Sequence, residues 1–288
     1  MWIILAVATA LCESVKDAVA KHTSMGSSEY TSALYLTGTA ALFLTLPVVV
    51  SPVPPLSRGF WIALCLAFFM VPSAKFLYMR AVKLSPLSQV IPLLSLTIVG
   101  NGVLSIFFDH RFPSPLGWTG MALVLLGIYA GRLESSETGF CLKAPFTSIW
   151  REPGAKSMLG VCVIWSFGGH ISKLLVSGSS PFFAAWATFT AGFLGLLLLG
   201  YLKRFSLLAP NNFLKKLISL GFMNALSEVF MLFALSIGYT PYVITVKRSS
   251  ILWSSILGKL IYHDNFNRYK WLGIFLNLYG IFLLAIDF

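Results

Sequence analysis

Long apolar runs without an acidic or basic side chain dominate this chain. Residues 30 to 57, 28 in all, contain no Asp, Glu, Lys or Arg, and the same holds for the 25 residues from 84 to 108 and the 29 from 174 to 202. A transmembrane helix needs about 20 predominantly apolar residues to cross the hydrocarbon core of a bilayer. Each run is long enough for this, and the pattern predicts an all-α integral membrane protein.

Breaks at proline, glycine and charged clusters divide the chain into ten predicted transmembrane helices. Residues 134–155 form the long polar connection, with five charged side chains, and separate a first set of five helices (1–133) from a second (156–288). The predicted helices cover residues 2–21, 30–50, 59–79, 86–107, 115–132, 156–175, 181–201, 214–237, 241–262 and 270–286.

The two sets of helices resemble each other in sequence. A Lys followed after four residues by Gly-Ser-Ser occurs at residues 21–28 and again at 173–180, an offset of 152. Because five is an odd number, the second set should enter the membrane from the opposite side, an inverted repeat typical of secondary transporters. The alternative is a chance alignment of apolar helices. Further ordered matches are Ser85-Pro86 with Thr240-Pro241, Asp109 with Asp264, and Trp118, Gly120 and Gly127 with Trp271, Gly273 and Gly280.

Basic residues outnumber acidic ones by 21 to 10, although only 11% of the chain is charged and its mean hydropathy is +0.82. They punctuate apolar runs instead of clustering on a solvated face, which excludes nucleic acid as a partner. Loops after odd-numbered helices hold fourteen Lys and Arg, against three after even-numbered helices. The positive-inside rule then predicts cytoplasmic odd loops and external termini. We expect a bacterial inner membrane location.

Ionisable side chains within apolar helices are the candidates for function, because inserting one costs about 2.5 to 3.5 kcal/mol. The ninth predicted helix contains adjacent Lys247 and Arg248, and Ser250 and Ser254 lie on the Lys247 face. Arg binds carboxylate or phosphate in a bidentate manner and Lys adds a compact charge, so the pattern favours an anion-binding site. Alternatively, the two cations only neutralise acids of other helices, such as Glu228.

The third and eighth predicted helices add four candidates. Lys75 lies several residues from the helix end, and Tyr78, three residues later, can share its face. Asn224 and Glu228 are four residues apart and so lie on one face of the eighth helix. Glu228 is a candidate proton site or counter-ion, with a structural ion pair as its alternative.

The first predicted helix carries four charged residues on one face, at spacings of three, four and eight: Glu13, Lys16, Asp17 and Lys21. They either pair with one another or line a pathway. In the second case Glu13 and Asp17 supply counter-charge or proton coupling. In the sixth helix, His170 has no acid near it in the sequence, and we expect it to pack in a polar interior.

The segments Phe76–Ser88 and Val246–Ile251, together with the two sets of five helices, resemble the drug/metabolite transporter superfamily, specifically its EamA-like members. This resemblance covers essentially the whole chain. Within the superfamily, plastid phosphate translocators bind phosphate with an adjacent Lys and Arg, similar to Lys247-Arg248, which implies an anionic or zwitterionic substrate. Two features depart from the family: Asp109 and Asp264 replace its usual Glu, and many members have cytoplasmic termini.

We therefore expect a secondary active transporter that moves a small polar metabolite by alternating access. The substrate would be anionic or zwitterionic, such as an amino acid or a phosphorylated or carboxylated compound, with a proton or a counter-substrate as the coupling partner. A flippase for a lipid-linked headgroup is the alternative. An intramembrane enzyme is disfavoured because no catalytic motif is present. We expect no cofactor, catalytic residue or metal, and a monomer or homodimer among membrane lipids.

Overall fold

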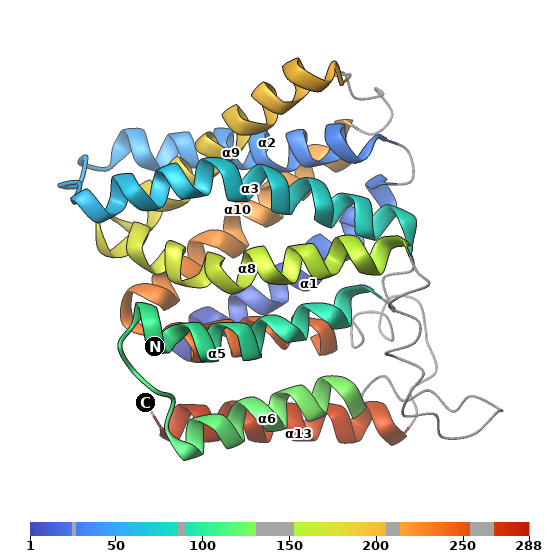
Figure 1. Cartoon of the computed structure of the whole chain (residues 1–288), viewed down its shortest axis with the longest axis vertical. Helices are drawn as coiled ribbons and strands as arrows, with labels where there is room; N and C mark the ends of the chain where they lie inside the picture. The colour runs from blue at the N-terminus through green and yellow to red at the C-terminus, as the bar shows by residue number, and fades with distance from the viewer. Residues whose placement is uncertain (25–26, 86–89, 131–152, 206–213, 254–267, 288) are drawn as a thin grey trace.

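The computed structural model describes residues 1–287 except 25–26, 86–89, 131–152, 206–213 and 254–267. The described residues form ten α-helices and one short 3-10 helix, and none of them lies in a strand, which confirms the all-α prediction for this part of the chain (Figure 1). The first half contributes α1 (Trp2–Ser24), α2 (Glu29–Val50), α3 (Arg58–Leu84), the 3-10 helix η1 (Ile91–Ser95), α5 (Leu96–Phe108) and α6 (Pro115–Ala130). The second half contributes α8 (Pro153–Ser177), α9 (Pro181–Lys203), α10 (Leu214–Ile237), α11 (Thr240–Arg248) and α13 (Arg268–Ile286).

Most predicted helices agree with these bounds to within a few residues, but two differ in form. Helix α3 continues to Leu84, five residues beyond the predicted end, and Lys83 in its last turn donates to the Ser27 carbonyl at 3.1 Å and lies 3.7 Å from Glu29. In the predicted fourth helix, Val90 has α-helical backbone and is followed by 3-10 helix η1 and then α5. Pro92 in the first turn of η1 cannot donate a backbone hydrogen bond.

The predicted ninth helix is interrupted beside its two cations. Regular α-helix ends at Arg248, and the Ser249 amide bonds to the Val246 carbonyl three residues back at 3.0 Å. Helical backbone then resumes over residues 250–253, and the rest of the predicted range lies outside the described residues. The prediction of one uninterrupted helix over 241–262 was therefore wrong at Ser249. A 3-10 turn within a helix often marks a functional hinge.

Helix packing is symmetric under exchange of the two halves. The contact between α3 and α8 has its equivalent in the contact between α10 and α1. In the same way, the contact between α5 and α8 has its equivalent in the contact between α11 and α1. The second helices of the halves, α2 and α9, contact each other, and so do the fifth, α6 and α13. Equivalent helices α1 and α8 run in opposite directions in Figure 1.

The glycines shared by the two halves explain how α6 and α13 approach so closely. A Cβ added to Gly127 would lie 2.7 Å from the Gly273 carbonyl oxygen, and one added to Gly280 would lie 2.7 Å from the Gly120 carbonyl oxygen. Exchanging the halves turns the first contact into the second. Small residues of this kind allow helix backbones to touch in membrane proteins.

The repeated Gly-Ser-Ser motif also has a structural cause, since its last serine begins the second helix of each half. Ser28 accepts a hydrogen bond from the Thr31 amide at 3.0 Å, and Ser180 accepts one from the Phe183 amide at 3.4 Å. Both serines have extended backbone, as expected of an N-cap residue.

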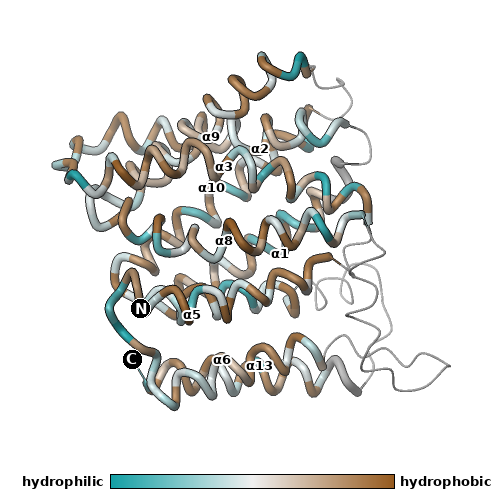
Figure 2. The backbone as a smooth tube through the Cα atoms, viewed as in Figure 1, coloured by the Kyte–Doolittle hydropathy of each residue, from teal (hydrophilic) through white to brown (hydrophobic). Residues whose placement is uncertain are grey.

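Many large apolar side chains are exposed on the bundle, whereas several charged side chains are buried within it. Figure 2 shows that hydrophobic residues predominate along the helices. Trp61 and Phe275 are exposed, whereas Lys16 and Arg248 are only 1% and 3% exposed. Within the part of the chain that the structure describes, five helices, namely α2, α3, α8, α9 and α10, are long and apolar enough to cross a membrane. Both termini lie on one side of the bundle in Figure 1.

Candidate functional site

A cavity of about 100 Å³ lies among α1, α3, α8, α9, α10 and α11. Its wall combines apolar side chains with a group of charged and amide side chains that come from both halves of the chain. Six of the ten residues predicted for the site line it: Glu13, Lys75, Asn224, Glu228, Lys247 and Arg248.

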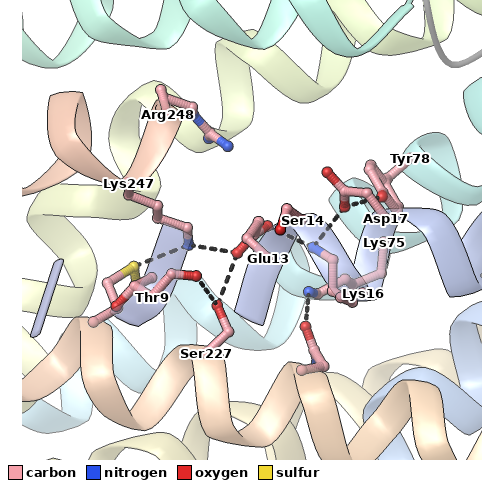
Figure 3. A network of polar contacts seen from close by, with 12 residues as sticks. Thr9, Glu13, Ser14, Lys16, Asp17, Lys75, Tyr78, Ser227, Lys247 and Arg248 are labelled. Atoms are coloured by element: carbon pink, nitrogen blue, oxygen red, sulfur yellow. Dashed lines mark hydrogen bonds and ion pairs between the residues drawn. The ribbon is translucent and has the colours of Figure 1, made fainter. Parts of the chain in front are cut away.

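Glu13 is the centre of the polar network at one wall of this cavity (Figure 3). Its carboxylate accepts from Lys16 Nζ at 2.5 Å and from Ser227 Oγ at 2.9 Å, and it lies 3.5 Å from Lys247 Nζ. Lys247 also contacts Met231 Sδ at 3.1 Å. Glu13 therefore neutralises cations from α1 and α11, and joins a helix of the first half to two helices of the second.

Asp17 and Tyr78 support this network from outside the cavity wall. Lys16 Nζ lies 3.3 Å from Asp17 Oδ1, and the Tyr78 hydroxyl donates to the same oxygen at 2.6 Å. Neither residue lines the cavity. Among the described side chains of this helix, Glu13, Lys16 and Asp17 therefore form ion pairs and Glu13 lines the cavity, while a pathway role for them stays a prediction.

Lys75 faces the cavity with an amide and aromatic rings as its neighbours. Its Nζ donates to Asn224 Oδ1 at 3.0 Å and lies 5.8 Å from the ring centres of Trp165 and Phe189. Among the described residues, no carboxylate lies within 4.0 Å of this ammonium group. The Asn224 Nδ2 group is buried and has no hydrogen-bond partner there, so a donor remains free at the wall.

Arg248 is the second cation of the wall without an acidic partner, and it stands apart from the network in Figure 3. Its Nε donates to Thr97 Oγ1 at 2.8 Å, and its guanidinium carbon lies 5.0 Å from the centre of the Trp165 ring. No carboxylate of the described chain lies within 4.0 Å of it. Sequence reasoning did not find Thr97, because a lone Thr in an apolar helix carries no signal. Trp165 contacts both Lys75 and Arg248, and so joins the two cations.

The charges around the cavity do not balance. Glu13 and Asp17 offset Lys16 and Lys247, whereas Lys75, Arg248 and Glu228 form no ion pair within the described residues, which leaves a formal charge of +1. Ionised groups in an apolar interior favour an oppositely charged ligand that offsets their desolvation. Of the other two predicted residues, Ser250 is buried away from the cavity wall, and Ser254 lies outside the described residues.

His170 packs in a polar interior, as expected, but an acid lies beside it. Asp109 Oδ2 lies 3.4 Å from its Nδ1, so an acid distant in sequence adjoins it in space. Phe108 stacks on the imidazole with ring centres 5.1 Å apart. The absence of an acid nearby in the sequence was misleading, because α5 brings Asp109 against α8.

An apolar-surfaced helical bundle with a charged cavity between two similar halves has the architecture of a membrane transporter. The model of the EamA-like transporter family matches residues 1–130 and 153–286, and this chain belongs to that family, within the drug/metabolite transporter superfamily. It is therefore a multi-pass integral membrane protein of a family of transporters, not enzymes.

Comparison with solved structures supports the same fold. A structure described as "Crystal structure of protein" matches with a TM-score of 0.73 over 99% of this chain and 96% of the other, at 14% sequence identity. Comparison with curated protein sequences gives no significant match.

Proposed function

We propose that this chain is a secondary active transporter of a small anionic or zwitterionic metabolite, with its substrate site in the cavity between the two halves. The observation that carries the proposal is the pair of cavity-lining cations, Lys75 and Arg248, with no carboxylate within 4.0 Å in the described chain. A charge in an apolar interior is retained only where something offsets its desolvation. A substrate carboxylate or phosphate would do so during each transport cycle.

The other groups of the wall favour an amino acid over a simple anion. Arg248 and Lys75 would bind the acidic group, and the free Asn224 Nδ2 would donate a further hydrogen bond to it. Glu228 lines the same cavity and forms no ion pair with the described residues, so it can accept the ammonium group of a zwitterion. Lys247 would stay with Glu13 as a structural pair or release it for coupling.

The cavity size and the helix symmetry support alternating access between an inverted pair of repeats, residues 1–133 and 156–288, joined by 134–155. A cavity of about 100 Å³ is smaller than the roughly 300 Å³ of the smallest ordinary ligand pockets, so a substrate can enter only when the halves move apart. The interruption of the helix at Ser249 supplies a bending point beside both cations of α11. Glu13, Asp17 and Glu228 are the candidates for coupling to protons or a counter-substrate.

The direct test is uptake into proteoliposomes of labelled amino acids, dicarboxylates and phosphorylated metabolites. We expect Arg248→Ala and Lys75→Met to abolish uptake of the substrate found, while Lys156→Ala, which removes an exposed lysine of α8, leaves the rate unchanged. Glu228→Gln should reduce uptake of a zwitterion and spare the matching acid that lacks the amino group. Uptake at the wild-type rate by both Arg248→Ala and Lys75→Met would contradict the proposed substrate site.

A flippase for a lipid-linked headgroup is the second candidate, favoured by a separate apolar groove of about 570 Å³ between α2 and α9. Leu34, Leu42 and Phe193 line this groove, which could receive an acyl or polyprenyl chain while the charged cavity binds a phosphate headgroup. Activity on polyprenyl-phosphate substrates, and none on water-soluble metabolites, would favour this function over the first.

Orientation and location are part of the proposal. The basic loops after odd-numbered helices favour a cytoplasmic location for that side and external termini, in what we expect to be a bacterial inner membrane. Labelling of single cysteines in each terminus with an impermeant maleimide on intact spheroplasts tests this, and labelling that requires lysis would reverse the orientation.

A further inference from the structure

A second polar site lies where α5 ends against α8, outside the wall of the charged cavity. His170 of α8 has a side chain only 1% exposed, and Asp109, the residue that caps the C-terminus of α5, presents its Oδ2 at 3.4 Å from His170 Nδ1. On the opposite side of the ring, Nε2 lies 3.2 Å from the carbonyl oxygen of Asn101. Phe108 covers one face of the imidazole at 5.1 Å and an interplanar angle of 16°.

The hydrogen-bonding capacities of these neighbours require an additional proton. A backbone carbonyl only accepts hydrogen bonds, and so does an ionised carboxylate. A neutral imidazole has one N–H, so either tautomer leaves one ring nitrogen with its lone pair facing an oxygen. The 3.4 Å between Nδ1 and Oδ2 is longer than an ordinary hydrogen bond, and both atoms are buried without a hydrogen-bond partner among the described residues. One proton between these two atoms removes the conflict and leaves the pair with no net charge.

We propose that His170 and Asp109 form a proton-binding site that couples the two halves of the transporter, an inference that rests on the proposed transport function. Asp109 belongs to the first half of the chain and His170 to the second, so the proton joins the halves directly. When the proton leaves, two acceptors face each other and this packing of α5 on α8 is disfavoured. Proton binding therefore favours the arrangement seen here, and proton release favours its opening.

The site lies between the protein surface and the cavity wall. The Asp109 side chain, which follows the last residue of α5, is 17% exposed, and α5 ends on the side of the bundle where both termini lie (Figure 1). On the inner side, Gly169 adjoins His170 and lines the charged cavity, and a Cβ added there would lie 2.4 Å from Asn101 Oδ1. A proton can thus arrive from the termini side at a residue next to the cavity wall.

The charged and titratable groups around the pair come from every neighbouring segment. Lys173 of α8 interacts electrostatically with Asp109, and donates to the carbonyls of Leu235 and Gly238 at the end of α10. Tyr239 interacts with both Asp109 and Arg111, and its hydroxyl donates to the Arg111 carbonyl at 2.8 Å. Across the cavity wall lie Lys75 of α3, Glu228 of α10 and Arg248 of α11.

The protonation state can be measured without any substrate. Protein labelled with 15N in its histidine rings, purified in nanodiscs, is titrated by NMR from about pH 5 to about pH 9, which brackets the ordinary titration of histidine. We expect both ring nitrogens of His170 to carry hydrogen at neutral pH, with the signal assigned by its loss in His170→Gln. His110, exposed and adjacent to Asp109, is the matched control. In Asp109→Asn, His170 should lose its Nδ1 hydrogen at neutral pH.

A His170 spectrum with a single ring hydrogen throughout this range in the wild type would overturn the inference, and the proposed substrate site would be unaffected. The coupling is tested separately with the substrate found in the uptake screen. An imposed proton gradient should accelerate wild-type uptake and leave uptake by His170→Gln unchanged. Equal acceleration of both proteins would also overturn the inference, whereas failure to find any substrate would contradict the proposed function and not the protonated histidine.

Discussion

Replacing Glu13 with Gln tests whether the polar network holds the two halves together. The substitution keeps the size of the side chain and removes the negative charge that two ammonium groups share. Lys16 would still have Asp17 at 3.3 Å, whereas Lys247 would lose its carboxylate at 3.5 Å, with no other within 4.0 Å in the described chain.

The size of the effect follows from burial. The side chains of Glu13 and Lys16 are 6% and 1% exposed, and that of Lys247 is 12% exposed, so water does little to screen them. Removing one partner of a buried ion pair costs about 3 to 5 kcal/mol. The carbonyl of the introduced amide still accepts one hydrogen bond, and Asp17 still pairs with Lys16. We therefore expect a loss of unfolding free energy at the lower limit of this range, about 3 kcal/mol. This is roughly a hundredfold change in the unfolding equilibrium constant.

The assay is equilibrium unfolding in mixed micelles with increasing dodecyl sulfate, followed by helical circular dichroism. Glu228→Gln is the matched control, since Glu228 lines the same cavity but forms no ion pair or hydrogen bond among the described residues. The Glu228→Gln substitution should lower the free energy of unfolding by less than about 1 kcal/mol, as expected for a weakly interacting charge. Equal destabilisation by the two substitutions would show that the network around Glu13 does not stabilise the fold.

Three further substitutions have defined outcomes. Gly127→Ala places a methyl group 2.7 Å from a backbone oxygen of α13 and should destabilise the protein by about 1 to 3 kcal/mol in the same unfolding assay, whereas Gly59→Ala, with its nearest atom at 3.6 Å, should not. Tyr78→Phe removes a hydrogen bond to a buried carboxylate and should cost about 1.5 to 3 kcal/mol, and no loss would mean that the bond is absent. Thr97→Val removes the acceptor of Arg248 Nε and should raise the KM for substrate uptake several-fold while expression persists, and an unchanged KM would show that Arg248 needs no such support.

The helix pattern was predictable because apolar length and charge breaks depend on local sequence. Predicted and observed bounds coincide for α10, and the Gly-Ser-Ser motif recurs because its final serine caps a helix twice. The interruption at Ser249 was not predicted, because Ser249 and Ser250 disfavour a helix only weakly and do not end it as proline would.

The site was predictable to the extent that a charge in an apolar segment is conspicuous. Lys75, Glu228 and Arg248 were identified on that basis and line one cavity. The ion-pair partners of these residues could not be predicted, because they depend on which helices pack against each other. The sequence therefore left open whether Lys247 pairs with Glu228 or with an acid of the first helix, and in the structure its partner is Glu13.

The glycine contacts between α6 and α13 have a mechanical consequence. The two backbones are in contact at two points, so under the proposed alternating access we expect this pair to stay together and act as a pivot shared by the halves. Helices α2 and α9 lie at the opposite end of the bundle in Figure 1. A small rotation at the pivot is therefore amplified with distance, and the largest displacements should occur at α2 and α9. A cross-link between α6 and α13 should leave this motion intact, whereas one between α2 and α9 should stop it.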